Sequence, residues 1–147
     1  MSDILRSCGI VLPVKEITQA CKEQNPEAVV IVDGAQSFGH IPVDMSEYGC
    51  DAYATCGHKW IGSPTGVGML FAKDGFIDPR SRAFLEYMQT ELPNPNYVGA
   101  KIALDLYRAI GGEDVYQRSA ALARSARVIL ASVPGLRFFP EEVKTPS

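Results

Sequence analysis

The chain has 147 residues, the length of one ordinary domain, and 46% of them are hydrophobic, enough to fill a buried core. Its 14 basic and 17 acidic residues are mixed along the sequence and give a net charge of -3, which favours neither nucleic acid nor a membrane surface as a partner. No apolar run approaches the ~20 residues of a bilayer span, and no secretory leader is evident. The four cysteines fit no metal-binding or redox spacing, so we expect reduced thiols, no bound metal and a cytoplasmic location.

The first third of the sequence predicts a strand, a helix and another strand. Residues 3–13 (DILRSCGIVLP) are apolar almost throughout and read as a strand that runs into Pro13, a residue suited to the first turn of a helix. A helix is predicted over residues 13–25, with its inner face formed by Val14, Ile17, Ala20 and Cys21. Residues 28–32 (AVVIV) then predict a strand buried on both faces.

The alternation continues toward the middle of the chain. Asp44, followed three residues later by Glu47, resembles a capping box for a short helix. Residues 51–56 (DAYATC) and 66–75 (GVGMLFAKDG) predict two more strands, and because we expect only a tight turn between them, this pair should be antiparallel. The sequence thus predicts an α/β fold with a mostly parallel sheet and one antiparallel strand.

The last half of the chain predicts a long loop and two helices. Residues 74–97 have little periodicity and contain three prolines, so they read as a loop of the kind that is functional or interfacial. Two helices follow, with inner faces formed by Ala103, Leu106, Tyr107 and Ile110 and by Val115, Leu122, Ala126, Ile129 and Leu130. A final strand is predicted at residues 134–140 (PGLRFFP), and elements so close to both ends suggest part of a larger protein.

Two side chains that can take part in chemistry lie directly after predicted strands. Asp33 follows the apolar run at 28–32, and the carboxyl ends of parallel strands are where open α/β sheets bind ligands; it could equally cap the turn at Gly34 and Ala35. Lys59 follows the strand at 51–56, and a lysine in a half-apolar pocket can form a Schiff base with a carbonyl, although alone it could be an exposed structural lysine. Together they suit an aldehyde cofactor with a pyridine ring, which needs an amine and an acid opposite its ring nitrogen.

These two regions carry a family resemblance. VVIVDGAQSFGHIPVD (29–44) and DAYATCGHKWIGSPTGVGMLF (51–71) together resemble the cofactor-binding core of class V aminotransferases, the pyridoxal 5'-phosphate (PLP) family that includes cysteine desulfurases and isopenicillin-N-epimerase-like enzymes. A weaker likeness extends from residues 9–17 to the helix at 99–112. The resemblance implies the large domain of a PLP-dependent transferase of fold type I, the aspartate aminotransferase-like fold.

The resemblance also implies roles for individual residues. Lys59 would be the Schiff-base lysine and the catalytic residue, and Asp33 would pair with the pyridine nitrogen. Gln36 would reach the phenolic oxygen of the ring, or serve as a turn residue, and His58 would help to hold the phosphate. We interpret His40, in the shared stretch before IPVD, as structural.

One position of the cofactor set departs from the family pattern. Desulfurase-like members carry a serine or threonine that donates to the phosphate two residues before the histidine, where this sequence has Cys56, a much weaker donor. Either Thr55 or a backbone amide compensates, or phosphate affinity is reduced. Cys56 therefore stays among the predicted cofactor-binding residues, although it replaces the serine or threonine of the family pattern.

Three hypotheses follow for the function. The first is a PLP-dependent enzyme that acts on an amino-acid substrate as a transaminase, epimerase or desulfurase/lyase and forms a homodimer in its full-length parent. The second is a truncated, non-catalytic fragment or interaction module, and the third is an unrelated α/β ligand-binding domain. Under the first, residues 1–112 belong to the PLP-binding large domain and residues 113–147 form a connecting helix and the start of the small C-terminal domain.

Overall fold

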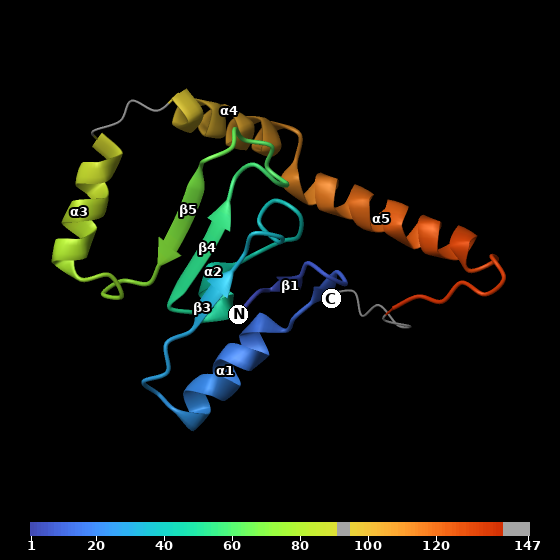
Figure 1. The fold of residues 1–147 in the computed structure, drawn as a ribbon, viewed down its shortest axis with the longest axis horizontal. Helices are drawn as coiled ribbons and strands as arrows, with labels where there is room; N and C mark the ends of the chain where they lie inside the picture. The colour runs from blue at the N-terminus through green and yellow to red at the C-terminus, as the bar shows by residue number, and fades with distance from the viewer. Residues whose placement is uncertain (91–94, 140–147) are drawn as a thin grey trace.

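The computed structural model describes residues 1–90 and 95–139, and its centre is a three-stranded mixed sheet (Figure 1). Strand β4 (Ala52–Cys56) lies between β3 (Ile31–Asp33) and β5 (Gly68–Ala72). β3 runs parallel to β4, and β5 runs antiparallel to it. The prediction of an α/β fold with a parallel pair and one reversed strand is therefore confirmed, but the connection between β4 and β5 is the long loop 57–67 and not a tight turn.

The N-terminal segment forms two short strands where the sequence predicted one. β1 (Ile4–Leu5) and β2 (Ile10–Val11) pair as an antiparallel hairpin. The chain reverses between them because the amides of Cys8 and Gly9 donate to the carbonyl oxygen of Leu5, and Gly9 adopts a φ of 71° that favours glycine. Before the hairpin, Ser2 pairs with Asp33 as an isolated parallel bridge, which places the N-terminus beside β3.

Helix α1 (Val14–Gln24) confirms the helix predicted after Pro13, but its inner face differs from the prediction. Val14 and Thr18 are its buried residues, whereas Ala20 and Cys21 are exposed and Ile17 is half-buried. The helix is also fixed by its far end, because Lys22 Nζ donates to both carboxylate oxygens of Asp51, at 2.9 and 2.8 Å. The inner face predicted from apolar spacing is wrong at Ala20 and Cys21.

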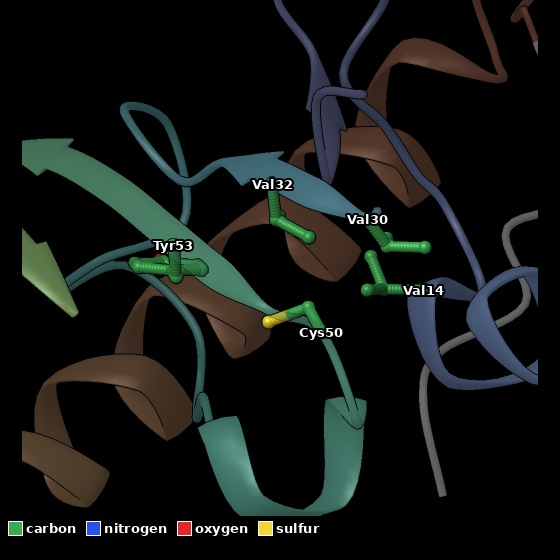
Figure 2. Packing of buried hydrophobic residues seen from close by; sticks show 5 residues of the cluster. All are labelled: Val14, Val30, Val32, Cys50 and Tyr53. Atoms are coloured by element: carbon green, nitrogen blue, oxygen red, sulfur yellow. The ribbon is translucent and has the colours of Figure 1, made fainter. Parts of the chain in front are cut away.

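The hydrophobic core cluster lies on the face of the sheet that carries Val32 and Tyr53, although Ala52 on the other face is also buried. Figure 2 shows its buried members, which come from α1, from β3 and the residue before it, and from β4 and the loop that precedes it: Val14, Val30, Val32, Cys50 and Tyr53. The alternate side chains Val29 and Ile31 are 62% and 50% exposed, so the prediction that residues 28–32 are buried on both faces is wrong. All four cysteines are free thiols, and burial raises the pKa of Cys50.

Helix α2 (Met45–Tyr48) follows the predicted cap. Asp44 accepts a hydrogen bond from the amide of Ser46 at 2.8 Å, as an N-cap residue does. Glu47 does not complete the predicted box in this arrangement: its carboxylate lies 3.9 Å from Lys15 Nζ on α1. The short helix thereby contacts α1 beneath the core.

The predicted loop over residues 74–97 is largely helical, which corrects the prediction. Helix α3 (Pro79–Thr90) begins directly after Asp78, whose carboxylate accepts from the amides of Arg80 and Ser81. A proline at the first helical position after an aspartate is a signal for the start of a helix. The lack of hydrophobic periodicity in this segment concealed it. Figure 1 shows α3 beyond the β5 edge of the sheet.

The two predicted C-terminal helices are present, but their predicted inner faces are largely exposed. In α4 (Pro95–Ala109), Ala100 is the buried residue, while Leu106 and Ile110 beyond its end are exposed. α5 (Gly112–Leu130) has no buried residue, and Leu122 and Ile129 are exposed. Figure 1 shows why: α5 extends away from the sheet, so nothing in the described part of the chain covers most of its length.

The end of the chain also differs from the prediction. Residues 134–139 form turns and irregular structure and no strand, and residue 140 lies outside the described residues. The domain boundary predicted after residue 112 falls at the first residues of α5 and stays a prediction. No described helix has the length and apolarity needed to cross a membrane.

The ion pair between Lys22 and Asp51 generates the first testable prediction. Its hydrogen bonds, together with one from the Val30 amide at 2.8 Å, hold the pKa of Asp51 below its ordinary value. The stabilisation is present above the unfolded pKa of about 3.9 and is lost as the pH falls through the folded value. We expect Asp51→Asn to lower the free energy of unfolding by about 1 kcal/mol at neutral pH, and by less in acid, in urea denaturation.

Asp105→Asn is the matched control for this prediction. Asp105 also pairs with a lysine, Lys101, at 2.5 Å, but both side chains are largely exposed. Surface pairs contribute little, so this variant should unfold like the wild type at both pH values. Equal destabilisation by the two substitutions would contradict the structural role given to Asp51.

Candidate functional site

The candidate site is formed by two loops at one edge of the sheet. Asp33 is the last residue of β3 and begins the loop 34–41, and Cys56 is the last residue of β4 and begins the loop 57–67. Since β3 and β4 are parallel, with Asp33 paired to Ala54, both loops leave from the same edge. The structure therefore brings the Asp33–Gln36 segment and the His58–Lys59 segment to the edge where open α/β sheets bind ligands.

Asp33 lies on the exposed face of the sheet and also caps a turn. One carboxylate oxygen, Oδ1, accepts a hydrogen bond from the amide of Ala35 at 3.0 Å. No cation pairs with the carboxylate among the residues that the structure describes. The capping interpretation is thus correct, and it leaves the second carboxylate oxygen available to a ligand.

Gly34 is held against β4 by its backbone. Its amide donates to the carbonyl oxygen of Ala54 at 2.8 Å, and its carbonyl oxygen accepts from Thr55 Oγ1 at 2.9 Å. A Cβ atom at this position would overlap the ring of Tyr53, so only glycine allows this close approach. The turn that carries Asp33 is therefore fixed to the strand that leads to Lys59.

A buried polar network lies beneath this turn. Ser37 Oγ donates to the carboxylate of Asp3 and lies 2.7 Å from the hydroxyl of Tyr53, and all three side chains are almost completely buried. A second oxygen of Asp3 accepts from the amide of Ile4 at 2.7 Å. Burial nevertheless raises the pKa of Asp3, because these bonds offset only part of the cost of removing the charge from water.

The sequence did not reveal this network. Ser37 and Tyr53 read as ordinary residues of a loop and a strand, and Asp3 reads as the polar first residue of the strand predicted over residues 3–13. A serine four residues after Asp33 is a general turn signal, but the partner at residue 3 is set by the parallel bridge between Ser2 and Asp33. Only the tertiary arrangement places these groups together.

The loop that carries Lys59 is anchored at both ends. The Gly57 amide donates to the carbonyl oxygen of Val67 at 3.1 Å, and the Ser63 amide donates to that of Gly57 at 2.9 Å. From α4, Asn96 Nδ2 donates to the carbonyl oxygen of Thr65 at 3.0 Å. Figure 1 shows α4 at the end of the sheet where this loop lies.

The predicted site residues in the loops keep their polar atoms available. His58 and Lys59 are exposed and Gln36 is half-buried. Across the described ranges, none of these three side chains makes a hydrogen bond or ion pair. The two loops, which are bonded to one another, thus present an acid (Asp33), an amine (Lys59) and two further polar side chains (Gln36 and His58). These groups fit the binding of a PLP molecule.

The neighbour of Cys56, Thr55, makes a hydrogen bond within the protein. The hydroxyl hydrogen of Thr55 is used within the protein, in the bond to the Gly34 carbonyl oxygen. Cys56 is half-buried at the end of β4, on the opposite side of the strand from Thr55. Which group would contact the phosphate at this position stays a prediction.

One groove of the molecule touches the loop 34–41 at Ile41. It has a volume of about 1010 Å³ and runs between the start of α1, the α2 segment and α5. Pro13, Tyr48 and Tyr116 are among its lining residues, and neither Asp33 nor Lys59 is.

The fold is that of PLP-dependent transferases of fold type I. A mutant of the protein C-DES, solved with glycine covalently linked to its PLP cofactor, matches 92% of this chain and 42% of its own with a TM-score of 0.72 and 30% identity. The family model for aminotransferase class V matches residues 3–82, more than half of the chain. The chain belongs to the aminotransferase class V family.

Curated relatives agree with this family. A cysteine desulfurase of Pectobacterium atrosepticum is 30% identical over 160 residues, which cover 95% of this chain and 39% of the relative. An isopenicillin N epimerase of Amycolatopsis lactamdurans is 45% identical over 75 residues, 50% of this chain and 18% of the relative. The chain thus spans about two fifths of the desulfurase.

These matches confirm the predicted family, fold and cofactor class. Cysteine desulfurases and class V aminotransferases are PLP-dependent enzymes, as the resemblance implied. The roles assigned to Asp33, Gln36, Cys56, His58 and Lys59 stay predictions.

The buried Asp3 generates a second testable prediction. Its pKa in the folded chain lies above the unfolded value of about 3.9, so its favourable contribution is complete below that value and is lost as the pH rises through the folded pKa. Asparagine has a similar shape and stays neutral. We expect Asp3→Asn to raise the free energy of unfolding, relative to the wild type, more at pH ~7 than at pH ~4 in urea denaturation.

Asp44→Asn supplies the opposite control. Hydrogen bonds from Ser46 lower the pKa of Asp44, so this variant should lose more stability at neutral pH than in acid. If Asp3→Asn differed from the wild type by the same amount at both pH values, the burial of a charged carboxylate beneath the turn would be refuted.

Proposed function

We propose that the chain carries the cofactor-binding core of a PLP-dependent enzyme of the class V type that acts on an amino acid. The observation that carries the proposal is the joining of two loops: Asp33 and Lys59 leave neighbouring parallel strands at one edge, and Gly34 is bonded to Ala54 and Thr55 between them. The available carboxylate and amine on these loops support the assignment.

The proposed roles divide between acid, amine and phosphate contacts. When bound, PLP acts as an electron sink that stabilises negative charge at the α-carbon of an amino acid. Asp33, oriented by the Ala35 amide, keeps a proton on the ring nitrogen through its carboxylate. Gln36 donates to the phenolic oxygen, and His58 with the segment at Cys56 contacts the phosphate.

Lys59 has two tasks in this proposal. Its amine would be the group that holds the cofactor through the cofactor aldehyde, as a lysine Schiff base. The same amine would also move a proton at the α-carbon of a bound amino acid. Its exposed position and lack of a partner in the described part of the chain leave it free to move between these tasks.

The reaction itself is proposed only as a class. Return of the proton at another carbon gives transamination, return on the opposite face gives epimerisation, and loss of a side-chain group gives desulfuration or elimination. Relatives named cysteine desulfurase and isopenicillin N epimerase support the last two. We propose an amino acid as the substrate and a homodimer as the form of the longer enzyme.

A second candidate function is a non-catalytic interaction module. It is favoured by the sheet face that carries Asp33, where the apolar side chains of Ile31 and Leu70 are 50% and 54% exposed. A partner that packed on this face would cover Asp33 and prevent a cofactor from reaching it. Attachment of PLP to the chain therefore discriminates between the two candidates.

The third testable prediction concerns covalent attachment. Purified chain mixed with PLP should develop a visible absorption band, and borohydride reduction should fix the label on Lys59, as located by peptide mass spectrometry. Lys59→Ala should lose this label, whereas Lys73→Ala, which removes an exposed lysine just after β5, should keep it. Equal labelling of the wild type and Lys59→Ala would contradict the assignment of Lys59 as the Schiff-base lysine.

The acid has its own test, the fourth prediction. Asp33→Ala should still form the reducible attachment at Lys59, because the amine is untouched, but turnover of amino acids should be abolished in the longer enzyme since the ring nitrogen loses its proton. Asp74→Ala, at an exposed carboxylate after β5, should leave both unchanged. Turnover that survives in Asp33→Ala would contradict the role of Asp33.

A further inference from the structure

An aromatic stack joins the two loops of the candidate site. The rings of His40 and Trp60 lie 3.7 Å apart between centroids with an interplanar angle of 13°. His40 belongs to the loop that begins at Asp33, and Trp60 is the immediate neighbour of Lys59. The contact therefore connects the residue beside the amine with the loop that carries the acid.

His40 is itself fixed within its loop. Its Nδ1 lies 3.3 Å from the carbonyl oxygen of Gln36, and its amide donates to the carbonyl oxygen of Ser37 at 2.8 Å. Ser37 is a member of the buried network with Asp3 and Tyr53. The imidazole thus presents a face that is held by the same turn as Asp33 and Gln36.

The residue after Trp60 in the lysine loop (residues 57–67) also contacts the acid loop (residues 34–41). Ile61 is buried, and a Cβ atom added at Gly39 would overlap its Cδ1 and lie 3.3 Å from its backbone nitrogen. Gly39 has a φ of 79°, a conformation that favours glycine. Trp60 and Ile61 therefore dock together on residues 39 and 40, and they fix the backbone directly after Lys59.

We propose that the His40–Trp60 stack positions Lys59 relative to Asp33 and Gln36, so that the amine meets the aldehyde of a cofactor held by that loop. The proposal rests on the function proposed above. The loop anchors at Gly57, Ser63 and Thr65 lie within the lysine loop or on α4, whereas the stack reaches the acid loop from the residue next to the amine. His40 and Trp60 are thus positioning residues and not catalytic ones.

The stack has a direct readout that needs no cofactor. Trp60 is the single tryptophan of the chain, and it is 48% exposed with one ring face covered by His40. In cofactor-free protein, His40→Ala should increase quenching of Trp60 fluorescence by acrylamide, and His40→Phe should restore the wild-type value. Phe84→Ala, which removes an exposed ring on α3, is the control that should leave quenching unchanged.

The effect on Lys59 is tested by a double-mutant cycle with PLP. An aromatic stack of this kind corresponds to roughly a 2- to 10-fold change in an equilibrium. We expect His40→Ala to weaken PLP binding by about that factor in the chain with Lys59, and His40→Phe to recover it. In a Lys59→Ala background, where binding is non-covalent, His40→Ala should change PLP affinity little.

The outcomes separate this inference from the proposed function. The first outcome is that His40→Ala makes the indole of Trp60 more accessible but leaves PLP affinity and labelling of Lys59 as in the wild type. This result would overturn the inference and leave the site assignment intact. Equal weakening with and without Lys59 would also overturn it, because a general loss of structure acts in both backgrounds. A wild-type chain that is not labelled on Lys59 would overturn the proposed function, and the inference with it.

Discussion

The packing of Tyr53 beneath Gly34 is the constraint on which the rest of the structure depends. Tyr53 is only 1% exposed, belongs to the core and lies where a Cβ at residue 34 would be. Its hydroxyl bonds to Ser37, which bonds to Asp3, so one ring connects the apolar core with the polar support of the turn. Because Gly34 is also bonded to Ala54 and Thr55, the turn cannot shift without moving the central strand.

The core and Asp33 lie on opposite faces of β3. In β3, Val32 points into the core, whereas Ile31 and Asp33 lie on the exposed face, as the alternation of a strand requires. The core therefore fixes Asp33 from behind without covering it. This arrangement explains how a carboxylate can be held rigidly and still be reached by a ligand, and it also leaves apolar side chains such as Leu70 exposed.

The lysine loop gains its order from contacts with other elements. Asn96 and Gly99 of α4 hold it from one direction, through a bond to Thr65 and close packing on Pro64. Trp60 and Ile61 dock on the acid loop from the other direction. Between these supports His58 and Lys59 project without protein partners among the described residues, so a rigid frame presents two side chains that can still move.

The sequence by itself determined the family, the α/β class with one antiparallel strand, and the placement of Asp33 and Lys59 after strands, because these features depend on local patterns and motif spacing. It could not determine which face of β3 is covered, the face that α1 turns inward or the exposure of α5, since periodicity shows that a face is apolar but not whether another element lies on it. Proline and low periodicity hid α3, whose start is set by Asp78 and Pro79. The partners of Ser37 and His40 were decided only in three dimensions, because Asp3 and Trp60 are distant in sequence and are brought near by strand pairing and loop docking.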